Sequence, residues 1–312
     1  MTAEDHSSNQ QAAKRVTVFG GSGFVGRSIV QRLVEGGASV RVAARHPETV
    51  KDLLPRAIGD KLETVRVDIH DDGAVTAATR DTDAVINLVA ILYEKGQQIF
   101  RSLHVDGARR IATAAKQAGA SRLVQMSALG ASATSPSAYA RTKAAGEQAV
   151  REVFPDATVV RPSIVFGRDD DFFNRFAGMA SISPALPLIG GGKSRFQPVF
   201  VEDVAAAFAA ILADPATAGK TYELGGPQVY TFRELMEILL EQMGSRRLLV
   251  PLPFMAAEVQ AYFLEWLPKP PLTRDQLALL RSDNVLGGHE PGLRELGIEP
   301  TSLESVLPTY IR

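Results

Sequence analysis

The sequence contains no cysteine, which excludes disulfide bonds, thiolate nucleophiles and cysteine-based metal sites. It also has no large excess of charge. Its 34 basic and 35 acidic residues give a net charge of −1, which does not favour a nucleic-acid partner. The five histidines show no metal-binding spacing, so we expect no metal site. Nothing here points to an oxidising compartment, and we expect a cytoplasmic protein.

Long apolar runs are missing as well, so we do not expect a transmembrane protein. Residues 1–14 are polar, without the apolar core of a signal peptide or the arginine-rich character of a transit peptide, and we expect a disordered tail there. Hydrophobic residues make up 45% of the 312 positions. That content is enough for the cores of a globular protein of about two domains.

Short β-type runs alternate with helical patterns in the first half of the chain. The expected strands are 16–19, 39–43, 64–67, 84–89, 123–126 and 158–161. The expected helices lie near 24–35, 47–54, 72–79, 98–118 and 137–153. This alternation predicts an α/β fold with a Rossmann-type, doubly wound parallel sheet that is covered by helices on both faces. Ligands of such sheets bind at the carboxyl ends of the strands.

The alternation ends after Pro162, and residues 168–198 are rich in loop-forming residues. Later helices begin at clear signals, such as the capping box that starts at Thr231. We therefore predict a Rossmann domain over 15–167. A smaller, mostly helical domain for substrate or partner binding follows over 168–312, with some interleaving between this part and the sheet.

Three glycines connect the first expected strand to the first expected helix. Gly20, Gly23 and Gly26 stand in the context in which such glycines mark a dinucleotide site. One makes the tight turn, one lets the backbone approach a pyrophosphate, and one lets helix and strand pack closely. The N–H groups of the helix N-terminus favour phosphate. The alternative is a glycine-rich turn without a ligand. Further expected contacts are Ser22, Phe24 and Val25.

The second expected strand ends near Arg45, and no acid occurs at positions 40–47. NAD-binding proteins usually place an acid here to bind the ribose 2′-hydroxyl, whereas an arginine accommodates a 2′-phosphate. Arg45, with Arg27 or Arg41 as further contributors, therefore favours NADP(H) over NAD(H). The alternative is that these are solvated arginines at the start of a helix.

Two further strand ends add residues to the expected nucleotide site. The third strand is followed by Asp68 and Ile69. The Asp68 carboxylate would accept a hydrogen bond from the adenine amino group, or it caps the helix that begins near Asp71. The fourth strand ends in small or apolar residues that would lie against a cofactor. These residues are Leu88, Val89 and Ala90.

A candidate catalytic set follows the fifth expected strand. Ser127 ends that strand, and Tyr139 and Lys143 come later with four-residue spacing, which places them on one face of a helix. An ammonium beside a phenol favours phenolate and lowers the pKa of the phenol. A tyrosine tuned in this way can pass a proton to or from a carbonyl or an alcohol. We expect Ser127 to hold the substrate oxygen.

These residues together resemble the short-chain dehydrogenase/reductase superfamily, in its extended and atypical branches. The matching pieces are the glycine turn, Asp68, Ser127, Tyr139-x-x-x-Lys143 and RPSIVFG at 161–167. Segments such as VINLVAILYE, YARTKAAGE and FQPVFVEDVA are similar to the NADPH-binding accessory subunits of respiratory complex I and their bacterial relatives. The resemblance covers about residues 15–312. It implies bound NADP(H), held also by Tyr139, Lys143, Pro162 and Ile164, and a C-terminal domain of the extended type.

The resemblance leaves the function open. One class is an enzyme that reduces or oxidises a carbonyl or alcohol on a small, apolar, quinone-like substrate, because related members are linked to ubiquinone metabolism. Another is a non-catalytic, nucleotide-bearing assembly or scaffold subunit of a respiratory membrane complex, held at the inner membrane through a partner. A sugar-nucleotide epimerase or reductase is a third alternative.

Two departures from the superfamily pattern bear on activity. Phe19 stands where many extended members have threonine, and His104 replaces the asparagine of the catalytic tetrad. His104 is then a proton relay, a sign of lost activity, or an ordinary helix histidine.

The segment 248–267 is rich in large apolar residues and holds the only tryptophan, Trp266. Prolines on both sides predict a short, separate helix. One face would pack on a core, and another would line an apolar pocket or dock a partner. Because basic residues are nearly absent within the segment, its composition disfavours direct adsorption to anionic lipid.

Overall fold

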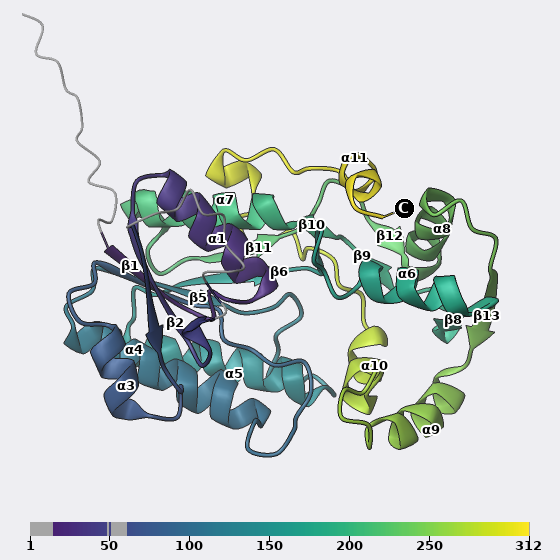
Figure 1. Ribbon diagram of the computed structural model, residues 1–312, viewed down its shortest axis with the longest axis horizontal. Coiled ribbons are helices and arrows are strands. Elements are labelled where there is room, and N and C mark those ends of the chain that lie inside the picture. Colours follow the sequence, from purple (N-terminus) through teal and green to yellow (C-terminus); the bar gives the residue numbers. More distant parts are fainter. Residues whose placement is uncertain (1–14, 49, 51–60, 312) are drawn as a thin grey trace, which may run out of the picture.

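The computed structural model describes residues 15–48, 50 and 61–311 (Figure 1). Within this part, seven parallel strands form one sheet in the order β11-β6-β5-β4-β1-β2-β3. Their bounds are β1 (Arg15–Phe19), β2 (Ser39–Ala44), β3 (Leu62–Arg66), β4 (Ala84–Asn87), β5 (Arg122–Met126), β6 (Thr158–Pro162) and β11 (Thr221–Leu224). The predicted parallel, doubly wound sheet is confirmed, and six of its strands lie where the sequence placed them.

The seventh strand, β11, was not predicted. Its sequence, Thr-Tyr-Glu-Leu, includes the charged residue Glu223 and does not alternate clearly between polar and apolar residues. The strand is fixed by parallel pairing with β6, in which Thr221 lies opposite Val159.

Two other expectations, the tail at 1–14 and most of the helix at 47–54, lie outside the described residues.

Helices cover both faces of the sheet (Figure 1). One face carries α1 (Phe24–Glu35) and α7 (Val201–Ala213), which pack against each other. The other carries α3 (Asp72–Ala78), α4 (Ala108–Gln117) and α5 (Ala138–Val153). Each face therefore buries its own apolar cluster. Both α7 and β11 come from the later part of the chain, which thus contributes to the layers of the first part.

The strand order reverses at β1. From β1 the chain continues to β2 and β3 on one side, then crosses by α3 to β4 on the other side of β1. Connections therefore leave the carboxyl ends of β1 and β4 in opposite directions. Such a switch point opens the crevice in which doubly wound sheets bind ligands.

The later part of the chain also forms a second lobe around an aromatic-rich core. Its pairs of short strands are β7 (Val165–Phe166) with β10 (Val199–Phe200), β8 (Ala185–Ile189) with β13 (Leu248–Leu252), and β9 (Arg195–Phe196) with β12 (Tyr230–Thr231). Its helices are α6 (Phe173–Ile182), α8 (Phe232–Gln242), α9 (Phe254–Leu264), α10 (Arg274–Leu280) and α11 (Leu303–Val306). Helix α8 begins at the predicted capping box of Thr231 and Glu234.

No helix in the described part of the chain is both long enough and apolar enough to cross a membrane. The same part holds no group of three or more His, Asp or Glu side chains that could bind a metal ion.

Candidate functional site

The three glycines of the first turn meet different physical demands. Gly20 has φ +82°, a left-handed conformation that favours glycine. A Cβ at Gly26 would lie 2.4 Å from the Gly20 carbonyl oxygen, so only glycine lets α1 pack on the turn. A Cβ at Gly23 would meet the protein only at ordinary contact distance, 3.5 Å. The space beside Gly23 is therefore left open for a ligand.

The N-terminus of α1 is suited to an anion. Gly23 is its N-cap, no side chain caps the helix, and the first turn contains no acid. The first N–H groups and the positive end of the helix dipole are thus available to phosphate. Together with the open space beside Gly23, this arrangement fits the pyrophosphate of a dinucleotide.

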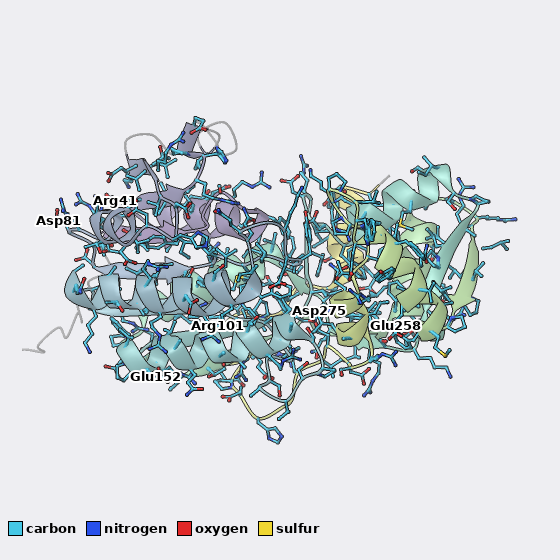
Figure 2. All side chains as sticks on the ribbon, turned by 90° about the horizontal axis from the view of Figure 1, so that it is seen from below. Arg41, Asp81, Arg101, Glu152, Glu258 and Asp275 are labelled. Carbon is cyan, nitrogen blue, oxygen red and sulfur yellow. The ribbon has the colours of Figure 1, made fainter. Side chains whose placement is uncertain are left out.

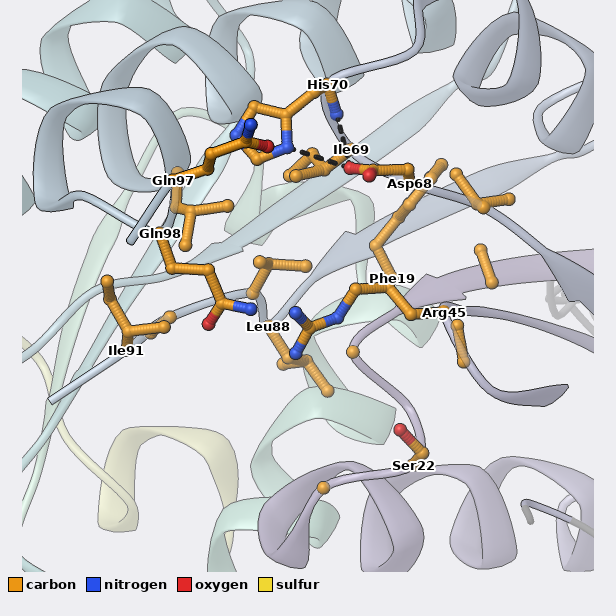
Figure 3. Close-up of a pocket in the computed structure, with 18 of the residues that line it drawn as sticks. Phe19, Ser22, Arg45, Asp68, Ile69, His70, Leu88, Ile91, Gln97 and Gln98 are labelled. Atoms are coloured by element: carbon orange, nitrogen blue, oxygen red, sulfur yellow. Dashed lines mark hydrogen bonds and ion pairs between the residues drawn. The ribbon is translucent and has the colours of Figure 1, made fainter. Parts of the chain in front are cut away.

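A cavity of about 560 Å³ lies at the switch point of the sheet (Figure 3). Nine of the residues predicted to bind the cofactor line it: Gly20, Ser22, Gly23, Arg45, Asp68, Ile69, Leu88, Val89 and Ala90. The other seven, Phe24, Val25, Gly26, Tyr139, Lys143, Pro162 and Ile164, do not line this cavity, and neither does Ser127. The carboxyl ends of β1 to β4 therefore converge on one site, as expected for a parallel sheet.

Arg45 extends into this cavity (Figure 3) and makes no hydrogen bond or ion pair with the rest of the described chain. Arg27 and Arg41, which were suggested as further contributors, are each paired elsewhere in this structure. Arg27 pairs with Asp169 at 2.9 Å, and Arg41 pairs with Glu63 at 2.9 Å. Arg45 is thus the basic side chain that this strand end presents to a ligand.

Asp68 forms a local unit with His70 at the edge of the cavity. One Asp68 oxygen accepts hydrogen bonds from the His70 backbone N–H at 3.0 Å and from its ring Nδ1 at 2.8 Å. These bonds, led by the backbone one, lower the pKa of Asp68. The alternative that Asp68 caps a helix is wrong, since Asp71 caps α3. His70 was missed, although it stands two residues after the predicted acid.

A polar loop that the sequence analysis overlooked completes the cavity wall. Lys95, Gln97 and Gln98 line it, and Lys95 and Gln98 bond to each other through their backbones. The Lys95 ammonium also donates to the carbonyl oxygen of Pro268 at 3.0 Å. This hydrogen bond therefore connects the wall of the cavity to the turn between α9 and α10. The only signal for it was a short polar run after β4.

Ser127 directly follows β5, and the side chain of Lys143 reaches the last residue of the same strand. The Lys143 ammonium donates to the carbonyl oxygen of Met126, the residue before Ser127, at 2.8 Å. Burial lowers the pKa of Lys143 to about 8. The Ser127 hydroxyl is fully buried and has no hydrogen-bond partner in the described chain. Because an unpaired buried hydroxyl is costly, the Ser127 hydroxyl is suited to bond to a bound ligand.

Tyr139 lies one turn before Lys143 on α5, with its ring edge-on to His104 at 5.4 Å between centroids. Burial and the negative charge of Asp275 raise the pKa of Tyr139 to about 12. The expected lowering of this pKa by Lys143 is therefore wrong for the chain without ligand. The Lys143 ammonium is directed to Met126 instead, and desolvation dominates.

His104 lies in the π-helix η2 (Arg101–Gly107) and is neutral. Its Nε2 accepts from the Ile91 N–H at 3.2 Å, so Nδ1 carries the proton and donates to Thr142 Oγ1 at 3.1 Å. Burial and the nearby Lys143 charge lower the pKa of His104 to about 3. With both ring nitrogens bonded within the protein, His104 agrees best with the ordinary helix histidine among the alternatives. A Cβ at Gly146 would lie 2.1 Å from the His104 carbonyl, so this glycine lets η2 approach α5.

Asp275 of α10 is a site residue that the sequence did not reveal. Its carboxylate accepts hydrogen bonds from Ser137 Oγ at 2.8 Å, Ala138 N at 2.6 Å and Tyr139 N at 3.2 Å. Figure 2 shows Asp275 where the two parts of the molecule meet. An acid at a helix N-terminus is favourable. Asp275 therefore anchors α10 on the helix that carries Tyr139 and Lys143.

We expect Asp275→Asn to lower the pKa of Tyr139, because the substitution removes a negative charge that raises it. The protein should also lose about 1–3 kcal/mol of stability, since a charged acceptor of three bonds is replaced by a neutral one. An alkaline titration of tyrosinate absorbance, corrected with Tyr139→Phe, measures the pKa. An unchanged pKa would show that Asp275 acts on α5 only as a cap.

Pro162 and Ile164 lie at the end of β6. The Pro162 carbonyl accepts from Leu129 N at 2.9 Å, and the Ile164 N–H donates to Asn284 Oδ1 at 3.1 Å. Asn284 also accepts from the Ser163 hydroxyl at 2.7 Å. Asn284, from the later part of the chain, therefore binds the residues that follow β6. The backbone N–H of Ile164 is already bonded within the protein.

Comparisons with known proteins agree with this geometry. Residues 16–225 match the model of the NAD dependent epimerase/dehydratase family. Subunit 9 of the mitochondrial NADH dehydrogenase (ubiquinone) 1 alpha subcomplex of Arabidopsis thaliana is 37% identical over 301 residues, covering 92% of this chain and 75% of that protein. Ceramide reductase of Caulobacter vibrioides is 32% identical over 242 residues, covering 76% and 73%.

Among solved structures, the dTDP-glucose 4,6-dehydratase DesIV from Streptomyces venezuelae, with NAD and TYD bound, is similar with a TM-score of 0.74. The match covers 96% of each chain at 24% sequence identity. At that identity the likeness is evidence for the fold. The family match supports a nicotinamide cofactor.

Proposed function

Because the chain belongs to the NAD dependent epimerase/dehydratase family, we propose that it is an NADP(H)-dependent oxidoreductase acting on a carbonyl or alcohol of an apolar, quinone-like substrate. The observation that carries this proposal is the buried Ser127 hydroxyl, which has no partner in the described chain. It lies next to a buried lysine and on the strand end that precedes the tyrosine helix. Buried hydroxyls are usually hydrogen-bonded, so an oxygen of a bound substrate is a suitable partner for Ser127.

Each catalytic side chain has a distinct role in this proposal. Ser127 donates a hydrogen bond to the substrate oxygen. Tyr139, protonated at neutral pH because its pKa is about 12, gives that oxygen its proton during reduction. Lys143 uses one N–H on Met126 and has two left for hydroxyls of the cofactor ribose. When bound, the nicotinamide supplies or accepts the hydride.

The choice of an apolar substrate rests on the surroundings of Tyr139. Phe100 and neutral His104 contact its ring. Two cations of the loop-rich segment 168–198 that a nucleotide sugar could attract are engaged within the protein. Arg175 donates to the Pro271 carbonyl, and Arg195 pairs with Asp283. The sugar-nucleotide alternative therefore receives less support than an apolar carbonyl compound.

We expect Arg45→Ala to reduce the preference for NADPH over NADH. A charged arginine–phosphate contact contributes about 1.5–3 kcal/mol, which corresponds to roughly 10- to 100-fold in affinity. Titration of both nucleotides into wild type and variant measures the effect. Arg27→Ala is the matched control, because Arg27 is paired with Asp169 and its loss should leave the preference unchanged. Equal affinities of the wild type for both nucleotides would reject the assignment of NADP(H).

The activity itself is tested with the purified protein. The nucleotide that co-purifies is identified first, and then oxidation of its nicotinamide is followed by absorbance after adding a short-chain quinone or a keto lipid. Substrate-dependent oxidation supports the proposal. Retained, reduced nucleotide with no response to quinones, ketones or alcohols contradicts it.

The second candidate is a non-catalytic subunit of a respiratory complex, peripheral to the membrane. It is favoured by the 37% identity to a mitochondrial NADH dehydrogenase subunit. In that role, bound nucleotide stabilises the fold by mass action, about 2.7 kcal/mol at a hundredfold excess over Kd. Co-purification with a membrane complex, unaffected by Tyr139→Phe, would favour this candidate.

A further inference from the structure

Helix α9 has two apolar faces, and only one of them is covered. Its inner face packs on the second lobe through small side chains, Ala257 and Ala261, which are fully buried. Large side chains point outward instead. They are Met255, Val259, Tyr262, Phe263 and Trp266, and we call them the α9 stripe.

Met255, Val259, Tyr262 and Phe263 follow the i, i+4, i+7, i+8 spacing of a single helix face, and Trp266 lies in the turn just after α9. Met255 and Trp266 are each 80% exposed, and Phe263 is 67% exposed. Leu267 just beyond it and Leu248 on the preceding strand β13 are exposed as well. Scattered exposed hydrophobic residues are ordinary, but a contiguous stripe of this kind marks an interaction surface.

The charges around the stripe show which partner fits. Both acids of the α9 segment are neutralised by arginines of α10. Glu258 pairs with Arg281 at 2.6 Å, and Glu265 pairs with Arg274 at 2.9 Å. Composition alone disfavoured adsorption to anionic lipid, because basic residues are nearly absent within 248–267. The fold brings Arg274 and Arg281 against this segment, and they offset its two acids. Figure 2 shows Glu258 on the lobe that carries α9.

Exposed basic residues stand at both ends of this apolar segment. Arg246 precedes β13, and Lys269 follows Trp266 by three positions. Arg274 and Arg281 also lie over the rings of Tyr262 and Phe254. A surface with Trp, Tyr and aliphatic groups in the centre and cations at its ends is complementary to an anionic lipid surface.

We propose that the α9 stripe is a docking surface for an anionic lipid bilayer, with its apolar side chains inserted between headgroups and Arg246 and Lys269 on the lipid phosphates. The helix lies in the plane of the interface, because its 11 residues are too few to span the membrane. Lys95, which lines the nucleotide cavity, bonds to Pro268 beside this surface. The docked protein would therefore hold that cavity close to the bilayer.

Trp266 is a direct probe, because it is the only tryptophan of the chain. The full protein is mixed with vesicles of phosphatidylcholine alone or with phosphatidylglycerol, and with vesicles whose acyl chains carry bromine. We expect a blue shift of the Trp266 emission, stronger with the anionic lipid, and quenching by the brominated chains. Unchanged emission with both vesicle types would overturn the proposal.

Variants separate the stripe from other causes of binding. Val259→Glu with Phe263→Glu should weaken vesicle partitioning about tenfold or more, because two apolar groups no longer leave water. Val229→Glu alters an exposed apolar residue outside the stripe and should leave partitioning unchanged. Lys269→Glu should reduce the preference for anionic lipid.

Two outcomes contradict the bilayer as the occupant. In one, Val259→Glu with Phe263→Glu binds vesicles as well as wild type does. In the other, the wild type forms a concentration-dependent dimer that this variant abolishes, while neither binds vesicles. Because all readouts are binding and emission, they do not depend on the proposed oxidoreductase activity.

Discussion

Tyr139→Phe is expected to lower turnover by about two to four orders of magnitude, because it removes the transferable proton and keeps the aromatic ring. The ring contacts with Phe100 and His104 do not involve the hydroxyl, so folding should be retained. Nucleotide affinity should change little, since Lys143 and the glycine turn are untouched. Turnover is measured as substrate-dependent NADPH oxidation, and affinity by titration.

Tyr262→Phe is the matched control, because Tyr262 lies on α9 and is exposed. It should leave turnover unchanged. Lys143→Ala should reduce both turnover and nucleotide affinity, as expected for a side chain with two roles. Normal turnover in Tyr139→Phe would remove this tyrosine from the mechanism, and the structural role of the nucleotide would then be the better explanation.

Gly26→Ala is expected to destabilise the protein by about 1–3 kcal/mol or more and to abolish nucleotide binding, because backbone atoms must move to admit the methyl group. The new Cβ would lie 2.4 Å from the Gly20 oxygen and 2.7 Å from the Gly21 Cα. The displaced turn can no longer form the phosphate site. Thermal unfolding without nucleotide, together with titration of NADPH, measures the two effects.

Gly23→Ala provides the contrast. Its Cβ would meet only the Gly20 oxygen, at 3.5 Å, so stability without nucleotide should be close to that of wild type. The methyl group would enter the space assigned to the pyrophosphate, and NADPH binding should be strongly weakened. A Gly23→Ala protein that binds NADPH normally would show that the nucleotide does not approach this turn.

Features that depend on local spacing were predictable from the sequence. The glycine turn, the parallel sheet and the shared helix face of Tyr139 and Lys143 follow from the identity of near neighbours along the chain. Arg45 and the residues after β3 and β4 could be assigned to one site for a related reason. Parallel strands present their carboxyl ends at one edge, so each strand end could be interpreted separately.

The fold class, the strand ends that line the cavity and the shared helix face of Tyr139 and Lys143 could therefore be predicted from the sequence. The tertiary structure decided the rest: the strand β11, the cap that Asp275 places on α5, and the raised pKa of Tyr139. It also paired the acids of α9 with arginines of α10. These features depend on contacts such as that between Ser137 and Asp275, which are 138 positions apart, and on burial. Long-range contacts and burial leave no periodic pattern in the sequence, because electrostatic energies depend on distance in space and on exclusion of water.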